Sequence, residues 1–204
     1  MPRLFRAVWV DTGNDPDWDK VAKYEMTHLF FDLFDPRLTP TYLRSVETRG
    51  YGTGLYVAAN WPQVSGTGIE FAEKVHKRLE VVDPGLDRAQ PKVQLDIEQH
   101  DPAYILNALE RWRRLRPKRD TSWTMESLQG GWMSPEFVAG VLACRVRIVP
   151  QYYKGDMGPM AMDVGLKEML KAGFPAHLVT GFYDAAVMPL PGWTGWAFSM
   201  GRLP

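Results

Sequence analysis

The sequence has few of the residues on which several protein classes depend. A single cysteine, Cys144, excludes an internal disulfide and a cysteine-based metal cluster. The four histidines are scattered along the chain and suggest no metal site, so we expect no metal and no cofactor. No apolar run is long enough to cross a bilayer, so we expect no membrane partner. The first residues lack the features of a signal peptide, which predicts synthesis and folding in the cytoplasm.

The chain also lacks an excess of positive or negative charge. The 24 basic side chains balance the 24 acidic ones, giving a formal net charge of +0. No global field therefore draws the chain to nucleic acid or to an anionic membrane. The one basic run, at 111–119, is interpreted as the solvated end of a helix, where cations are favoured near the negative pole. We expect no nucleic-acid partner.

Aromatic residues are abundant, at 12% of the chain, and eight of them are tryptophans. Packing in the core is the ordinary explanation for such residues. Tryptophan rings also serve as stacking platforms in sugar-binding clefts, so the excess mildly favours a carbohydrate site. The length of 204 residues suits one domain with a sizeable core, and no linker or low-complexity segment interrupts residues 1–204.

The segment 92–99 combines a strand pattern with two closely spaced acids. Read as a strand, it points Val93, Leu95 and Ile97 to one face and Gln94, Asp96 and Glu98 to the other. Two carboxylates two positions apart on one face lie within about 7 Å of each other along the backbone. Each raises the proton affinity of the other, which is costly in a purely structural strand. The pattern therefore indicates acid/base chemistry at the end of a strand.

Seven further segments have the composition of strands, and helical segments separate most of them. Several helices begin with a capping side chain followed by proline: Asp15-Pro16, Thr39-Pro40, Asp101-Pro102 and Ser134-Pro135. The predicted helices cover about 15–26, 40–50, 69–82 and 161–171, and two more begin at 101 and at 134, the first with an apolar stripe that reaches Trp112. The predicted strands are 4–11, 28–35, 51–61, 92–99, 121–127, 145–153, 177–184 and 193–199.

Eight strands alternating with helices predict a compact (β/α)₈ barrel of the α/β class. About 200 residues is the lower limit for this fold, and 185–191 is too short and proline-rich for a full helix. The sequence thus predicts a barrel with a reduced last quarter, in which helices 7 and 8 are short or missing. The alternative is an open, doubly wound α/β sheet, which usually has fewer strands.

In such barrels the active site lies at the carboxyl ends of the strands. Acids, amides, phenols and tryptophans recur at the predicted ends, whereas Lys154 alone is basic there, which disfavours a phosphate site. Glycoside hydrolysis needs one protonated carboxyl as acid and a second carboxylate as nucleophile, base or electrostatic stabiliser. We assign Glu98 as the general acid and Asp96 and Asp11 as its ionised partners. The predicted substrate-binding residues are Asp32, Trp61, Glu126, Gln151, Tyr152, Tyr183, Asp184 and Trp196.

These residues carry a resemblance to a known family. The Asp96-Ile97-Glu98 strand, the aspartate that closes the first strand and the segment 54–57 resemble the family 25 glycoside hydrolases, which are lysozyme-like muramidases common in phage endolysins. The resemblance implies a short barrel that cleaves the β-1,4 bond between N-acetylmuramic acid and N-acetylglucosamine in peptidoglycan. It also implies that Glu98 is the proton donor and that Asp11 and Asp96 line the site. The family's usual Gly-x-Asp-x-Ser opening is replaced here by Val8-Trp9-Val10-Asp11-Thr12.

Two other functions remain open at this stage. The first is a catalytically silent barrel that binds glycan or forms part of a phage virion or tail, with a virion or homo-oligomer partner covering its reduced end. The second is a hydrolase that uses the acids to hold a hard cation such as Mg²⁺. A phage-derived enzyme would act on the cell wall or as a virion component.

Overall fold

The computed structural model describes residues 5–10, 12–84, 91–98, 101–126, 133–151, 167–179, 181–182 and 195–199. Within these ranges, only the backbone is described at positions 5, 126, 151, 181–182 and 195–199. No helix in the described ranges is long and apolar enough to cross a membrane.

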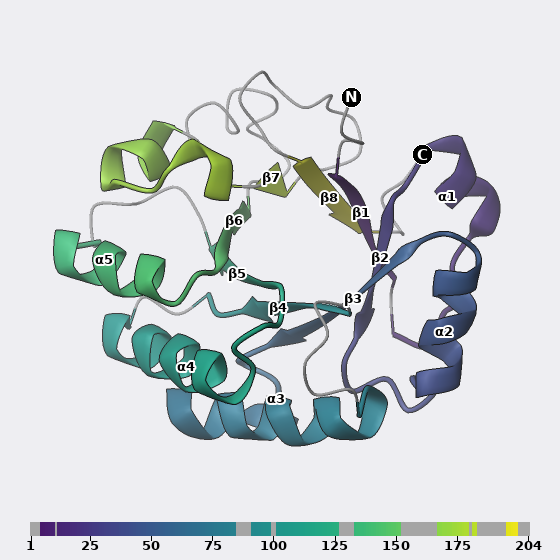
Figure 1. Ribbon diagram of the computed structural model, residues 1–204, viewed down its shortest axis with the longest axis horizontal. Helices are drawn as coiled ribbons and strands as arrows, with labels where there is room; N and C mark the ends of the chain where they lie inside the picture. The colour runs from purple at the N-terminus through teal and green to yellow at the C-terminus, as the bar shows by residue number, and fades with distance from the viewer. Residues whose placement is uncertain are drawn as a thin grey trace.

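Eight parallel strands form a closed barrel in which each strand pairs with the next and β8 pairs with β1. Figure 1 shows the strands as a central ring with helices around its outside. The predicted (β/α)₈ barrel is confirmed, and the open doubly wound sheet is wrong because β1 and β8 close the ring. The strands are β1 Phe5–Val10, β2 His28–Asp32, β3 Gly52–Ala58, β4 Lys92–Asp96, β5 Thr121–Glu126, β6 Arg147–Gln151, β7 Gly181–Phe182 and β8 Gly195–Ser199.

The helices follow the strands in alternation. They are α1 Trp18–Lys23, α2 Pro40–Thr48, α3 Gly68–Val82, α4 Pro102–Leu115, α5 Pro135–Ala143 and a helix at 167–172, with short 3-10 turns at η1 Pro62–Val64 and η3 Ala176–Leu178. The two-residue β7 fits the reduced C-terminal part that the sequence predicts. Residues 183–194, where the seventh helix is expected to be short or missing, lie outside the described residues.

Side-chain caps set where most helices begin. Thr39, Asp101 and Ser134 accept backbone N–H groups of the first turns of α2, α4 and α5, which confirms three of the four predicted caps. The fourth is wrong, because Asp17 and not Asp15 caps α1, through a bond of 3.1 Å from the Lys20 N–H. The chain therefore enters α1 two residues later than predicted.

Alternating side chains divide the core into two parts. The larger part lies between the barrel and the helices and includes Val93, Leu95 and Ile97, all fully buried. The smaller part fills the barrel interior with Ala7, Phe30 and Val149, against which Trp9 and Tyr56 pack. The predicted face assignment of β4 is thereby confirmed for its apolar side, and Gln94 lies on the interior side.

Gln94 links three strands across the barrel interior. Its Oε1 accepts a 2.9 Å hydrogen bond from the indole N–H of Trp9, and its Nε2 donates to the hydroxyl of Thr124. Gln94 is 2% exposed, so both bonds satisfy amide groups that would be costly to bury alone. This network lies one interior layer below Asp96 and supports the carboxyl end of β4.

Candidate active site at the carboxyl ends of β3 and β4

Asp96 and Glu98 lie together at the end of β4. Asp96 is the last residue of the strand and is 9% exposed, whereas Glu98 lies two residues beyond and is half-buried. Both line a cavity of about 200 Å³, whose other walls are Ala58, Ala59 and Asn60 at the end of β3. The structure thus brings the two predicted catalytic carboxyls into one hollow at the face of the barrel where such folds carry their chemistry.

Backbone bonds hold this hollow in shape from both sides. The Ala59 N–H donates to the Asp96 carbonyl at 2.8 Å, and Ala58 lies directly beside Asp96 in the pairing of β3 with β4. On the other side, β5 fixes Ile97: the Ile97 N–H donates to the Thr124 carbonyl at 2.9 Å. The buried Trp123 indole donates to the Ile97 carbonyl at 3.1 Å. The residue between the two acids therefore has both backbone polar groups bound.

The two acids have different surroundings and therefore different proton affinities. Burial raises the pKa of Asp96 well above its ordinary value of 3.8, and the nearby charge of Glu98 raises this pKa further. The sequence predicts that Asp96 is an ionised partner. In the structure, desolvation favours the neutral form of Asp96, so the ionised role stays a prediction.

A row of aromatic rings leads from the barrel interior to Trp61, just after the end of β3. Trp9 and Tyr56 stack with centroids 5.0 Å apart, and Tyr56 meets the edge of Trp61 at 5.7 Å. Phe34 contacts Trp61 from the other side at 6.5 Å. Trp61 directly follows Asn60 in the chain and is half-buried, so part of this predicted sugar-stacking residue faces solvent.

Asp32 connects two loops at the same face. Its Oδ2 accepts a 2.6 Å hydrogen bond from the Thr12 hydroxyl and its Oδ1 a 2.7 Å bond from the Phe34 N–H. Asp35 similarly accepts the Gly13 N–H at 3.0 Å and binds Arg37, which lowers the Asp35 pKa to about 2. The predicted substrate-binding residue Asp32 is 8% exposed; its Oδ2 holds the segment after β1, and its Oδ1 holds the loop after β2.

The remaining predicted residues are described only in part. Glu126 and Gln151 are the last residues of β5 and β6 and pair with each other in register, so their backbones lie at the expected face. The sequence predicts Trp196 at the carboxyl end of its strand, and the structure corrects this. Trp196 pairs with Arg6, the second residue of β1, and β8 continues to Ser199. Trp196 therefore lies toward the amino ends of the strands, away from the acids. Asp11, Tyr152, Tyr183 and Asp184 lie outside the described residues.

Four residues at the site were not among those predicted from the sequence: Ala58, Ala59, Asn60 and Trp123. The two alanines and Asn60 belong to the cavity because the register of β3 and β4 places Ala58 against Asp96. The polar end of β3 was visible in the sequence as Asn60-Trp61, so Asn60 had a signal. No local pattern marks Trp123 as the donor to Ile97, because the two residues are 26 positions apart.

A larger hollow, of about 640 Å³, lies at the opposite end of the barrel. It is lined by segments that precede β2 and β3, including Thr27 and Tyr51, and its Glu25 pairs with Arg6. Barrels of this type concentrate stability and not chemistry at that end. Among the residues with described side chains, no three His, Cys, Asp or Glu gather as a metal-binding group. The acids at the carboxyl end are therefore the candidate site.

Comparisons with known proteins find likeness in structure and not in sequence. No family model matches the chain, and no curated protein matches it. Active domain 2 of a thermostable chitinase from Pyrococcus furiosus, solved as catalytic-site mutants with chito-oligosaccharides, superposes with a TM-score of 0.65. The sequences are 12% identical, and the match covers 97% of this chain and 83% of that chain.

Two further structures place that match in context. An endo-β-N-acetylglucosaminidase from Cordyceps militaris has a TM-score of 0.65 at 12% identity, covering 98% of this chain and 82% of that chain. CutC from Streptococcus agalactiae, assigned to copper homeostasis, has a TM-score of 0.61 at 10% identity, covering 98% and 100%. The same barrel thus occurs in glycosidases and in a protein of another class. At these identities the likeness shows the fold alone.

Proposed function

We propose that this protein is a glycoside hydrolase that uses the acid pair at the end of β4. The observation that carries the proposal is the shared hollow of a buried acid with a raised pKa, Asp96, and a half-buried acid, Glu98. Two carboxyls whose surroundings separate their proton affinities are what hydrolysis of a glycosidic bond requires. The half-buried Trp61, next in the chain to Asn60 of the cavity wall, supplies an apolar face for a sugar ring.

The roles follow from depth in the cavity. Glu98, nearer to solvent, takes up the one proton that the acid pair holds and donates it to the leaving glycosidic oxygen. A water molecule adds its hydroxyl to the anomeric carbon, and the other proton of that water returns to the acid pair. Asp96 lies deeper, where burial favours its neutral form, so it supplies Glu98 with that proton. Asp11, which follows β1 in the sequence, is the ionised carboxylate that stabilises the positive charge developing on the sugar.

A glycan containing N-acetylglucosamine is the substrate that we propose, with bacterial peptidoglycan as the specific case. The family 25 resemblance of Asp96-Ile97-Glu98 supports the muramidase reaction. The two glycosidases with the same fold support N-acetylglucosamine more broadly, since one was solved with chito-oligosaccharides and the other is an endo-β-N-acetylglucosaminidase. Residues 1–204 would act as one domain, on the cell wall or as a phage virion component, without nucleic acid or membrane.

Release of reducing ends from purified peptidoglycan, and separately from chito-oligosaccharides, tests this function. We expect release by the wild type, unchanged by a chelator, because carboxyls alone perform the chemistry. Loss of release on chelation would replace the proposal by the Mg²⁺-dependent hydrolase. Binding of either glycan without any release would replace it by the silent glycan-binding or virion barrel.

A further inference from the structure

The hollow at the amino end of the barrel has a lining that the proposed reaction does not use. It is formed by the end of α1 and the residues just after α2, two helices that neighbour each other on the outside of the ring (Figure 1). Its volume of about 640 Å³ falls within the roughly 300–1,000 Å³ of sites that enclose a whole small molecule. The hollow therefore has room for a ligand of its own.

The floor of this hollow is apolar, and the way α1 ends fixes it. The Glu25 N–H donates to the Ala22 carbonyl at 3.0 Å. The Met26 N–H donates to the Val21 carbonyl, also at 3.0 Å, which completes the Schellman pattern of a helix end. Val21 and Met26 both line the hollow and are buried. Because the two helix carbonyls are already bonded, the floor offers apolar surface to a ligand.

Glu25 occupies a backbone position that normally favours glycine. Its φ of 51° lies in the left-handed region, where a side chain is disfavoured. The carboxylate of Glu25 pairs with the guanidinium of Arg6, the second residue of β1. Glycine would end α1 with less strain but would supply no carboxylate. Glu25 therefore neutralises one of the two arginines that line the hollow.

Arg49 is the other arginine, and an aromatic ring holds it without a carboxylate. Its guanidinium lies over the Trp18 ring, 4.5 Å from the centroid, and Trp18 also contacts Tyr51, with ring centroids 5.8 Å apart. With the described residues, this exposed guanidinium makes no hydrogen bond and no ion pair. A guanidinium stacked on a ring keeps its edge free, and the N–H fork at that edge matches a carboxylate or a phosphate. Arg49 is therefore the group that an anion in the hollow would meet.

The charges of the lining limit what this anion can be. Arg6, Arg49 and Glu25 together leave a single positive charge. Arg49 also lies where α2 ends, and the negative pole of that helix disfavours a second negative charge on the ligand. A phosphate ester carries nearly two negative charges at neutral pH, so one would lie unpaired near Glu25. A carboxylate carries one charge and presents two oxygens to the fork.

We propose that this hollow binds a small amphiphilic monocarboxylate, a molecule with one carboxylate on an aromatic or aliphatic body. Arg49 binds the carboxylate, and the body lies on Val21 and Met26 beside the Tyr51 ring. The site lies at the opposite end of the barrel from the acid pair and performs no chemistry. It goes beyond the proposed glycosidase function and does not depend on it.

Titration calorimetry on the full chain tests this site with phenylacetate, phenylacetamide and phenyl phosphate. The three probes share a phenyl body and differ in the charge of the attached group. The proteins are the wild type, Arg49→Gln, Arg44→Gln and Ala22→Leu. Arg44 is exposed on α2 and does not line the hollow, so Arg44→Gln is the matched control for charge. Ala22 is exposed on α1 and lines the hollow, so a leucine there fills space without altering a charge.

We expect the wild type and Arg44→Gln to bind phenylacetate equally, and more tightly than the other two probes. Arg49→Gln should weaken phenylacetate binding by about tenfold to a hundredfold, which is the size of lost hydrogen bonds between charged groups. Its affinity for phenylacetamide should match that of the wild type. Ala22→Leu should weaken the binding of phenylacetate although both arginines remain.

Four results would overturn the proposal. They are no binding of phenylacetate by the wild type, equal affinity for phenylacetamide, tighter binding of phenyl phosphate, and phenylacetate binding that survives Ala22→Leu unchanged. Circular dichroism checks that each variant is folded. If Arg49→Gln does not fold, Ala22→Leu decides the location of the site, and the comparison with phenylacetamide in the wild type decides the need for a negative charge.

Discussion

Asp96 shows how a single residue can be costly to the fold and useful to the site. Its carboxyl is buried, and its pKa is raised well above 3.8. A group with a higher pKa in the folded than in the unfolded state stabilises the fold fully below the unfolded pKa. That stability is lost as pH rises through the folded pKa. Near neutral pH, Asp96 therefore lowers the stability of the protein relative to a neutral side chain of the same shape.

The variant Asp96→Asn tests this balance. The amide is nearly isosteric and does not ionise, so we expect equal or greater stability at pH 8, by about 1 kcal/mol, in urea denaturation. The wild type should lose stability from acid toward alkaline pH relative to the variant. Glycan hydrolysis should fall by about 10²-fold or more, because the amide has no carboxyl proton to supply to Glu98. A clearly destabilised variant with full activity would make Asp96 a structural residue.

At the scale of elements, two helix glycines lie at close contacts between helices. One faces the backbone of the neighbouring helix, and the other faces a side chain. A Cβ on Gly68, at the start of α3, would overlap the backbone carbonyl oxygen of Tyr104 on α4. A Cβ on Gly140, in α5, would meet only the side chain of Leu106, with its Cδ2 at 2.8 Å. A backbone atom cannot give way, whereas the end of a leucine side chain can change rotamer.

These surroundings predict opposite effects of alanine. Gly68→Ala should destabilise the protein by about 1–3 kcal/mol through overpacking. Gly140→Ala should be neutral or stabilising by up to about 1 kcal/mol, because alanine is the better helix former. Thermal or urea unfolding of both variants checks the pair. Equal effects would contradict the close approach of α3 and α4.

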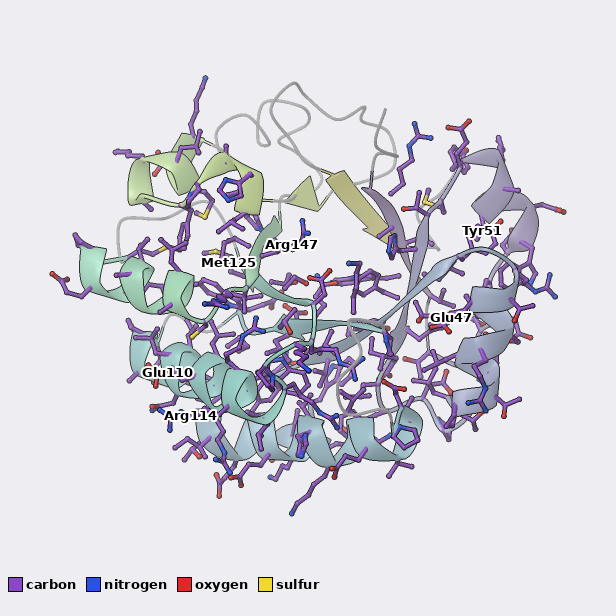
Figure 2. The ribbon with its side chains drawn as sticks, viewed as in Figure 1. Glu47, Tyr51, Glu110, Arg114, Met125 and Arg147 are labelled. Carbon is purple, nitrogen blue, oxygen red and sulfur yellow. The ribbon has the colours of Figure 1, made fainter. Side chains whose placement is uncertain are left out.

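The basic run at 111–119 shows why an element must be seen in three dimensions. Its composition alone predicts a solvated helix end. In the structure, Arg111 binds Glu73 of α3, and Arg113 donates to the Cys144 and Arg145 carbonyls after α5. Arg119 is buried against Asp83 at 2.9 Å. Glu110 and Arg114, on the outer side of α4 in Figure 2, are the more exposed pair. The run therefore joins neighbouring elements instead of facing solvent throughout.

Features that depend on neighbouring residues could be predicted from the sequence, whereas features that depend on distant residues could not. Caps such as Thr39 and Asp101 act within one helical turn, so they could be read locally. Strand alternation correctly placed Gln94 on the face opposite Leu95. The misplaced Trp196 lies in a run, Trp-Ala-Phe-Ser, that has no signal for the strand end. The raised pKa of Asp96 depends on depth of burial, and the place of Asn60 in the cavity wall depends on strand register. A single sequence shows neither.

Across the whole molecule, charged groups gather at the amino end of the barrel, opposite the acids. Asp120 pairs with Lys92 and lies 3.6 Å from Arg147, which Figure 2 labels at β6. His28 lies near these groups, and burial, followed by the charge of Lys92, lowers its pKa from 6.5 to about 4. The fold thus holds His28 neutral beside two cations.

This arrangement predicts a stability change between pH 6.5 and pH 4. Below pH 6.5 the unfolded chain binds a proton at His28 that the folded protein refuses until about pH 4, so stability falls as pH falls across this window. The free energy of unfolding should fall by about 3 kcal/mol in total, because a lowered pKa costs about 1.4 kcal/mol for each tenfold loss of proton affinity. The stability difference between wild type and His28→Gln, measured by urea unfolding at several pH values, isolates this contribution. A difference that does not vary between pH 6.5 and pH 4 would refute it.

The central claim is that the acid pair at the end of β4 makes this barrel a glycosidase. The most direct measurement compares reducing-end release from peptidoglycan and chito-oligosaccharides by the wild type and by Glu98→Gln, with folding checked by circular dichroism. The glutamine keeps the shape but cannot donate the proton, so we predict release by the wild type and a loss of at least about 10²-fold in the variant. A folded Glu98→Gln that releases reducing ends at the wild-type rate would contradict the account.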